Sequence, residues 1–177
     1  MNKQFYFLLL ICLIIFEAVA MPSHHSKMSQ EGNLMYAVIK DFAKRMKYEK
    51  NLQLEAIGGG VDNGINEFTL GFRREGLPLN KKESETLIVL ITEEFISEVN
   101  SNEMIRPYLR DYPISNTNVD MGIVNYDFKG NVIETPNVAI VCTDKDKIVY
   151  FYKGPKDIYD YKDERESYEE ALKKIKQ

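Results

Sequence analysis

Histidine is nearly absent from this sequence. Of the 177 residues only two are histidines, His24 and His25, and both lie in residues 21–32. That segment, MPSHHSKMSQEG, precedes the first regular pattern and is interpreted as a flexible lead-in. Histidine is the usual base of Ser-His and Cys-His sites and a common zinc ligand. Its absence from residues 33–177 excludes nearly all such sites there, so we expect no metal site and no cofactor.

Cysteine is also scarce. Cys12 lies in the N-terminal apolar run, so Cys142 is the only cysteine of the remaining chain, which permits no internal disulfide. Cys142 belongs to the strand-like stretch VAIVCTD, where a cysteine is ordinarily a small buried hydrophobe. A nucleophilic thiol needs a neighbouring base or cation, and the sequence indicates none. We therefore interpret Cys142 as a core residue.

The apolar run at the N-terminus is too short to cross a bilayer. It extends from Phe5 to Phe16, whereas a spanning helix needs roughly 20 residues. Lys3 precedes the run and Ala18-Val19-Ala20 follows it, which is typical of a cleaved signal peptide. We predict a signal peptide over residues 1–20, a secreted or periplasmic location, and no stable membrane span after cleavage. A retained N-terminal membrane anchor is the alternative.

Neither sign of charge is concentrated anywhere in the chain. The 23 basic and 27 acidic residues are interspersed and give a net charge of −4. Proteins that bind phosphate backbones cluster their Lys and Arg, so we do not expect nucleic acid to be a partner. No repeat or linker interrupts residues 33–177, which have a length that suits a single domain.

Three helices are predicted from apolar spacing and capping residues. The first covers about residues 31–49. The second begins after Asn80, with Glu83 completing a capping box, and the third begins at Asp163, with Glu166 in the same role. Between the helices five segments have strand character: Leu52–Val61, Ile65–Arg73, a stretch around residues 119–123, Val138–Thr143 and Ile148–Tyr152.

These elements follow one another as α-β-β-α-β-β-β-α. Hairpins join most of the strands, which favours an antiparallel sheet of about five strands with the helices packed mainly on one face. The predicted fold class is α+β.

The segment IGGGVDNGI sets the register of the first hairpin. Asn63 and Gly64 suit a two-residue type I′ turn because both of its positions need positive φ. Side chains alternate across a strand, so the turn sorts residues by face. The core face is expected to carry Glu55, Ile57, Gly59 and Val61, the first three opposite Phe72, Leu70 and Phe68. The other face carries small residues: Ala56, Gly58, Gly60, Thr69 and Gly71.

A strip of small residues allows another backbone or a side chain to approach closely. The strip would be filled by one of the protein's own helices, by a second copy of the protein, by a ligand or by a peptide. Alternatively, the glycines serve only to let the strands bend. In the last hairpin Tyr150 and Tyr152 share one face, which is either covered or offered to a partner. The candidate binding residues are Ala56, Gly58, Gly60, Thr69, Gly71, Tyr150 and Tyr152.

The leading functional hypothesis is a non-catalytic domain that binds a protein or peptide through this sheet face and an exposed strand edge. One rival is a small-ligand carrier with a pocket between the sheet and the second helix. The other rival is an enzyme that uses carboxylates alone, which would require two or more carboxylates converging in a cleft.

Residues 99–109, VNSNEMIRPYL, together with the earlier strand EAIGGG, are similar to small exported proteins of host-associated bacteria. The resemblance covers most of the chain after the signal peptide. It implies no activity and no functional residue.

Overall fold

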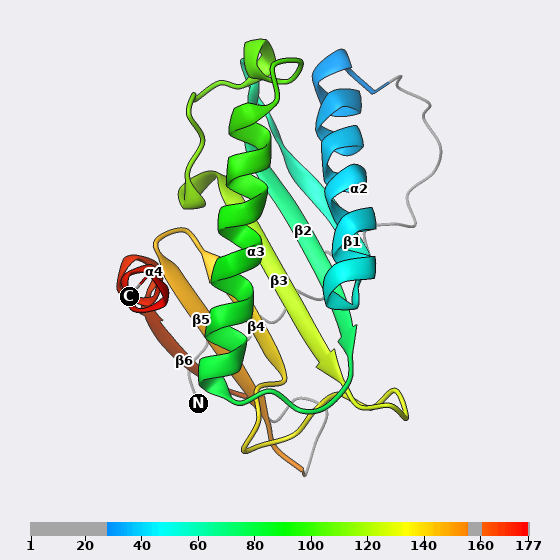
Figure 1. The fold of residues 1–177 in the computed structure, drawn as a ribbon, viewed down its shortest axis with the longest axis vertical. Coiled ribbons are helices and arrows are strands. Elements are labelled where there is room, and N and C mark those ends of the chain that lie inside the picture. The colour runs from blue at the N-terminus through cyan, green and yellow to red at the C-terminus, as the bar shows by residue number, and fades with distance from the viewer. Residues whose placement is uncertain (1–27, 156–160, 177) are drawn as a thin grey trace, which may run out of the picture.

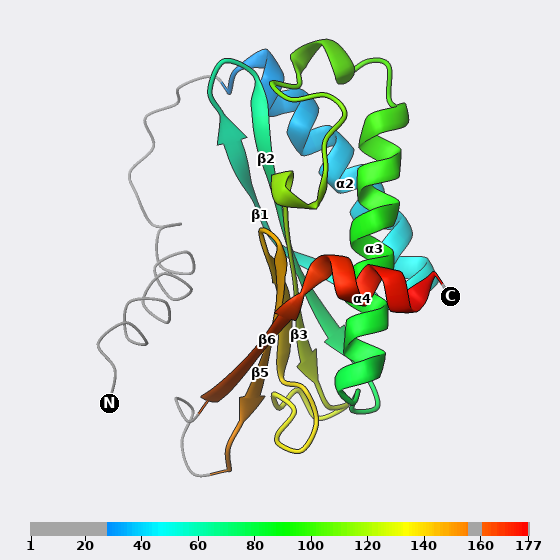
Figure 2. The ribbon, with the colours of Figure 1, turned by 90° about the vertical axis from the view of Figure 1, so that its left-hand side faces the viewer.

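The structure is a computed structural model that describes residues 28–155 and 161–176. A six-stranded sheet carries three α-helices on one of its faces, so the coarse prediction of an α+β fold is confirmed (Figures 1 and 2). The predicted signal peptide and residues 21–27 of the lead-in lie outside the described residues. The first described helix begins at Gln30, inside the segment predicted as lead-in.

The helices are α2 (Gln30–Lys50), α3 (Lys81–Ser101) and α4 (Tyr168–Ile175). The predicted capping box of α3 is present: Asn80 accepts a hydrogen bond from the Glu83 backbone, and the Glu83 side chain accepts one from the Asn80 backbone. The predicted start of the last helix at Asp163 is wrong. α4 begins at Tyr168, and the Ser167 side chain caps it by accepting from the backbone of Glu170.

The strands lie in the sheet in chain order. They are β1 (Leu52–Val61), β2 (Ile65–Glu75), β3 (Val119–Tyr126), β4 (Ile140–Asp144), β5 (Lys147–Lys153) and β6 (Tyr161–Ser167). Four neighbouring pairs are antiparallel, whereas β2 and β3 are parallel. A parallel pair needs a long crossover, and α3 supplies it. The prediction of a purely antiparallel sheet is therefore wrong.

The predicted strand count is wrong by one because β6 carries almost no strand signal. Five of its seven residues are charged, and its apparent capping box suggested a helix. Pairing with β5 over its whole length, from Lys147 opposite Ser167 to Lys153 opposite Tyr161, overrides that local preference.

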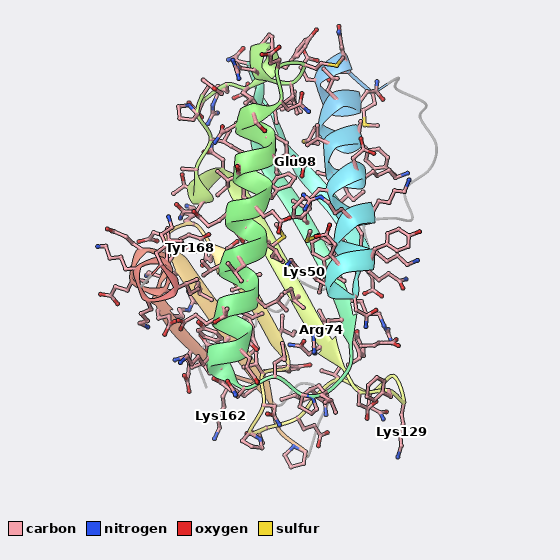
Figure 3. The ribbon with its side chains drawn as sticks, viewed as in Figure 1. Lys50, Arg74, Glu98, Lys129, Lys162 and Tyr168 are labelled. Atoms are coloured by element: carbon pink, nitrogen blue, oxygen red, sulfur yellow. The ribbon has the colours of Figure 1, made fainter. Side chains whose placement is uncertain are left out.

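The hydrophobic core lies between the sheet and the helices. Phe95 of α3 is fully buried, and its ring packs edge-to-face on Phe42 of α2 and Phe68 of β2, with ring centroids 5.0 and 5.4 Å apart. Arg45 of α2 also pairs with Glu94 and Glu98 of α3. Glu98 lies between the two helices (Figure 3).

The opposite face of the sheet carries no helix in the described part of the chain (Figure 2). Among residues 28–155 and 161–176, no helix combines the length and the apolar character that spanning a membrane requires.

Candidate functional site

The β1–β2 hairpin has the predicted central register. Gly59 lies opposite Phe68, and Ile57 lies opposite Leu70. Asn63 and Gly64 have the predicted positive φ, 51° and 111°, but the predicted two-residue turn is wrong because Val61, not Asp62, pairs with Ile65. Only the central residues of the hairpin are sorted to the two faces as the sequence indicated.

Both ends of the hairpin depart from the expected pairing. The loop has three residues, since Val61 pairs with Ile65, and Val61 is 43% exposed instead of lying in the core. At the other end a bulge at Glu55 places Leu54, not Glu55, opposite Phe72. An extra residue of this kind lets an apolar side chain replace a charged one on the core face.

The five predicted small residues do lie together. Ala56 pairs with Gly71, Gly58 pairs with Thr69, and Gly60 pairs with Glu67 on the face opposite the helices. Ala56 and Gly71 approach so closely that a Cβ at Gly71 would lie 2.9 Å from the Ala56 Cβ. The strip continues into β3, where Gly122 lies beside Gly71.

The two predicted tyrosines are not part of this surface. Tyr150 and Tyr152 point to the helix side of the sheet, and the Tyr150 side chain is fully buried. The Lys81 ammonium of α3 lies 4.9 Å from the Tyr150 ring centroid. The structure thus divides the seven candidate residues between the two faces of the sheet.

The two edges of the sheet differ sharply in charge. β6 presents Lys162, Asp163, Glu164, Arg165 and Glu166 within seven residues. β1 has one charged residue in ten, Glu55, and no described strand pairs with its outer side. Edge strands of soluble proteins are normally protected by charge, proline or shortness. β6 has this protection, whereas β1 has only the charge of Glu55 and the irregular pairing near its two ends, at Glu55 and between Gly60 and Val61.

No family model, curated protein or solved structure matches this chain. Its likeness to exported proteins of host-associated bacteria stays a prediction.

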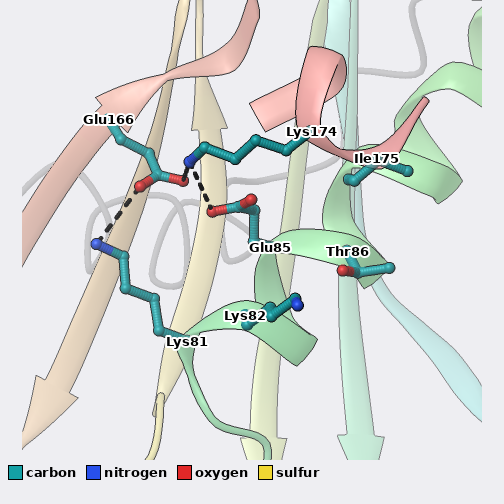
Figure 4. Close-up of a pocket in the computed structure, with 7 residues that line it drawn as sticks. All are labelled: Lys81, Lys82, Glu85, Thr86, Glu166, Lys174 and Ile175. Atoms are coloured by element: carbon teal, nitrogen blue, oxygen red, sulfur yellow. Dashed lines mark ion pairs between the residues drawn. The ribbon is translucent and has the colours of Figure 1, made fainter. Parts of the chain in front are cut away.

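A second polar site, which sequence reasoning missed, joins four elements on the helix side. Glu85 of α3 and Glu166 of β6 converge on the buried hydroxyl of Tyr150. That hydroxyl donates to Glu166 Oε1 at 2.8 Å, and Glu85 Oε2 lies 3.4 Å from the same oxygen. Lys81 Nζ lies 3.4 Å from Glu166 Oε2, and Lys174 Nζ of α4 lies 3.8 Å from Glu85 Oε2 (Figure 4).

The two carboxyl groups lie at the same tyrosine hydroxyl and have pKa values displaced in opposite directions. Burial, with the hydrogen bond and charge of Glu166, raises the pKa of Glu85. Burial also acts to raise the pKa of Glu166, but hydrogen bonds from Glu85 and Tyr150 and the charges of Lys81 and Lys174 outweigh it and lower that pKa. Of the two, Glu85 therefore binds a proton more tightly than an ordinary glutamate, and Glu166 loses its proton more readily.

This pair meets the geometric requirement that we set for a carboxylate-dependent enzyme, because two carboxylates converge beside a pocket. The pocket is lined by Lys81, Lys82, Glu85, Thr86, Glu166, Lys174 and Ile175. Both carboxyl groups are, however, already paired with groups of the same chain, namely a buried tyrosine and two ammonium groups. Such a polar network holds α3, β5, β6 and α4 together. In the described ranges no three His, Cys, Asp or Glu side chains are placed to hold a metal ion.

A further carboxylate pair lies on the face opposite the helices. Asp120 of β3 lies beside Thr69 and hydrogen-bonds Glu67 of β2. Burial, followed by this hydrogen bond and the nearby charges of Glu67 and Asp144, raises the pKa of Asp120 to about 6. Neither residue could be singled out from the sequence, because their contact depends on the parallel β2–β3 pairing.

Proposed function

We propose that this protein is an exported, non-catalytic domain that binds an extended peptide segment of a protein partner along the outer side of β1. The single observation that supports this proposal is the difference between the two sheet edges. A strand of ten residues with one charge and three consecutive glycines, Gly58 to Gly60, is a template for strand addition.

The chemistry of β1 defines the kind of segment it suits. Backbone hydrogen bonds to an added strand would supply much of the affinity, and alternate side chains would supply selectivity. On the face opposite the helices, Gly58 leaves room for a peptide side chain to lie across the strand, whereas the Asn66 side chain fills the space beside Gly60, where a Cβ would lie 2.2 Å from Asn66 Oδ1. Since β1 contributes only Glu55 as a charge, binding should depend little on salt.

Peptides selected from a displayed random library against the mature protein provide the test. We expect the selected peptides to alternate apolar residues. Q53K and A56K place charges on β1 and should weaken binding at least about tenfold, because a strand added beside them would have to desolvate a lysine. D163N on β6 changes charge by the same amount on the protected edge and should leave affinity unchanged.

A further variant separates the strand edge from the sheet face. T69K puts a lysine on β2, within the face but away from the edge, and should have little effect if the peptide pairs with β1. Selected peptides that lose affinity to T69K but not to Q53K would place the partner on the face and overturn edge pairing. Peptides that bind all four variants equally would overturn both.

A further inference from the structure

The two C-terminal elements, β6 and α4, are held to the domain by few apolar side chains. In α4 only Tyr168 and Ala171 are buried, and β6 is mostly charged. Leu172 and Ile175 of α4 also pack, partly buried, against the core, and the remaining attachments are the β5 ladder and polar contacts to α3. The attachment of β6 and α4 to the domain therefore depends on polar contacts more than that of most other parts of the described fold.

The polar contacts form two groups along α3. In the first, Glu93 receives a hydrogen bond from the Tyr168 hydroxyl at 3.1 Å and pairs with Lys176 at 3.7 Å. The second is the Glu85–Glu166 pair with its tyrosine and lysines, in which α3 supplies one carboxyl group and β6 the other. Only the second group brings two carboxyl groups to the same hydroxyl.

The charge balance of this second group depends on the proton bound by Glu85. With the proton present, one carboxylate faces two ammonium groups, Lys81 and Lys174. Without it, two carboxylates, Glu85 buried and Glu166 partly buried, lie at the same Tyr150 hydroxyl, and like charges that share a site repel. The titratable and charged groups that face the pair come from α3, β5, β6 and α4: Lys81, Lys82, Tyr150, Tyr152, Glu164 and Lys174.

We propose that β6 and α4 form a C-terminal strap whose closure on α3 is controlled by protonation of the Glu85–Glu166 carboxyl pair, which meets at the Tyr150 hydroxyl across the α3–β6 contact. Loss of the proton leaves two negative carboxylates at the α3–β6 contact, and their repulsion favours opening. Opening uncovers the edge of β5 and with it Tyr150 and Tyr152, the aromatic pair that the sequence analysis singled out. This inference is independent of binding at β1.

The direction of the pH effect follows from the two titrations. Glu85 holds its proton more tightly in the closed strap than in an open one, so closure weakens as the pH rises above the ordinary range of a glutamate. Glu166 is ionised more readily in the closed strap, so closure also weakens at strongly acid pH. The strap is therefore most firmly closed in a mildly acid range.

Amide hydrogen exchange of the full-length protein, resolved by segment and corrected for the intrinsic effect of pH, measures strap opening. Between about pH 5 and 8 the β6 amides should lose protection relative to β1 and β2, by at most about tenfold for each pH unit across which Glu85 titrates. E85Q keeps a donor to Glu166 but has no proton to lose, so its β6 protection should not vary with pH.

E93Q is the matched control, because it alters the other polar contact on the same strap. It should lower β6 protection by a similar factor at every pH and leave the profile unchanged in shape. Y150F removes the hydroxyl from the pair and should move the midpoint of the profile to higher pH. Wild-type β6 protection that is constant with pH, an E85Q profile like that of the wild type, or an unmoved midpoint in Y150F would each overturn the proposal.

Discussion

Gly59 lies opposite Phe68 in the β1–β2 hairpin, with a backbone conformation and surroundings that admit no side chain. Its φ is 153°, and a Cβ there would lie 2.4 Å from the Glu67 carbonyl oxygen and 2.6 Å from the Met35 sulfur of α2. The middle glycine of the triplet is thus required by the close packing of α2 on β1.

Replacing Gly59 by alanine should destabilise the fold by about 2 kcal/mol, because the strand must shift away from β2 and α2. Urea unfolding monitored by circular dichroism measures the change. G58A is the control: its Cβ would meet the Thr69 Cβ at 3.2 Å, a contact that a small movement relieves, so it should cost less. Equal losses of unfolding free energy in G59A and G58A would show that the packing of α2 on β1 does not require glycine at position 59.

The aromatic contact of α2, β2 and α3 should dominate the stability of the core. F95A removes a fully buried ring that touches Phe42 and Phe68, and should cost about 3–5 kcal/mol. L90A on the same helix truncates a side chain that is 46% exposed and should cost under about 1 kcal/mol. Denaturant unfolding of the two variants tests this ordering. A loss below about 1 kcal/mol for F95A would contradict the packing described here.

The Asp120–Glu67 pair should make stability depend on pH. The pKa of Asp120 is about 6 in the folded protein, above its unfolded value, so its contribution is greatest at low pH and is lost as the pH rises to about 6. D120N should therefore stabilise the protein at pH 7.5, by about 1 kcal/mol once solvent screening of a half-buried group is allowed for.

The measurement is the difference in urea midpoint between pH 5 and pH 7.5, compared for D120N and the exposed β6 variant D163N. We expect D120N to reduce the fall in midpoint and D163N to leave it unchanged. A wild-type midpoint that rises between these two pH values would have the wrong sign for this pair.

The sequence predicted those parts of the fold that are determined by interactions between residues close together in the chain. The turn signal of Asn63 and Gly64 predicted the central pairing of the hairpin, although the loop has three residues instead of two, and the Asn80–Glu83 capping box marked the start of α3. Both features depend on residues within a few positions of each other. The bulge at Glu55 had no such signal, because it arises from competition between Leu54 and Glu55 for a place against Phe72.

Long-range pairing decided the features that were missed. The parallel contact of β2 with β3 joins segments separated by all of α3, and it alone brings Asp120 to Glu67. Glu166 was assigned to a helix cap because β6 resembles a helix start more than a strand. With that strand unrecognised, its approach to Glu85 and Tyr150 could not be foreseen, and the two tyrosines were grouped with residues of the opposite face.

Binding at the edge of β1 is tested most directly by amide exchange of the protein with and without a library-selected peptide. We expect new protection at amides of β1, none at β6, and loss of the β1 protection in A56K. Protection that appears at β6 or on α3 while β1 exchanges as in the free protein would contradict the account.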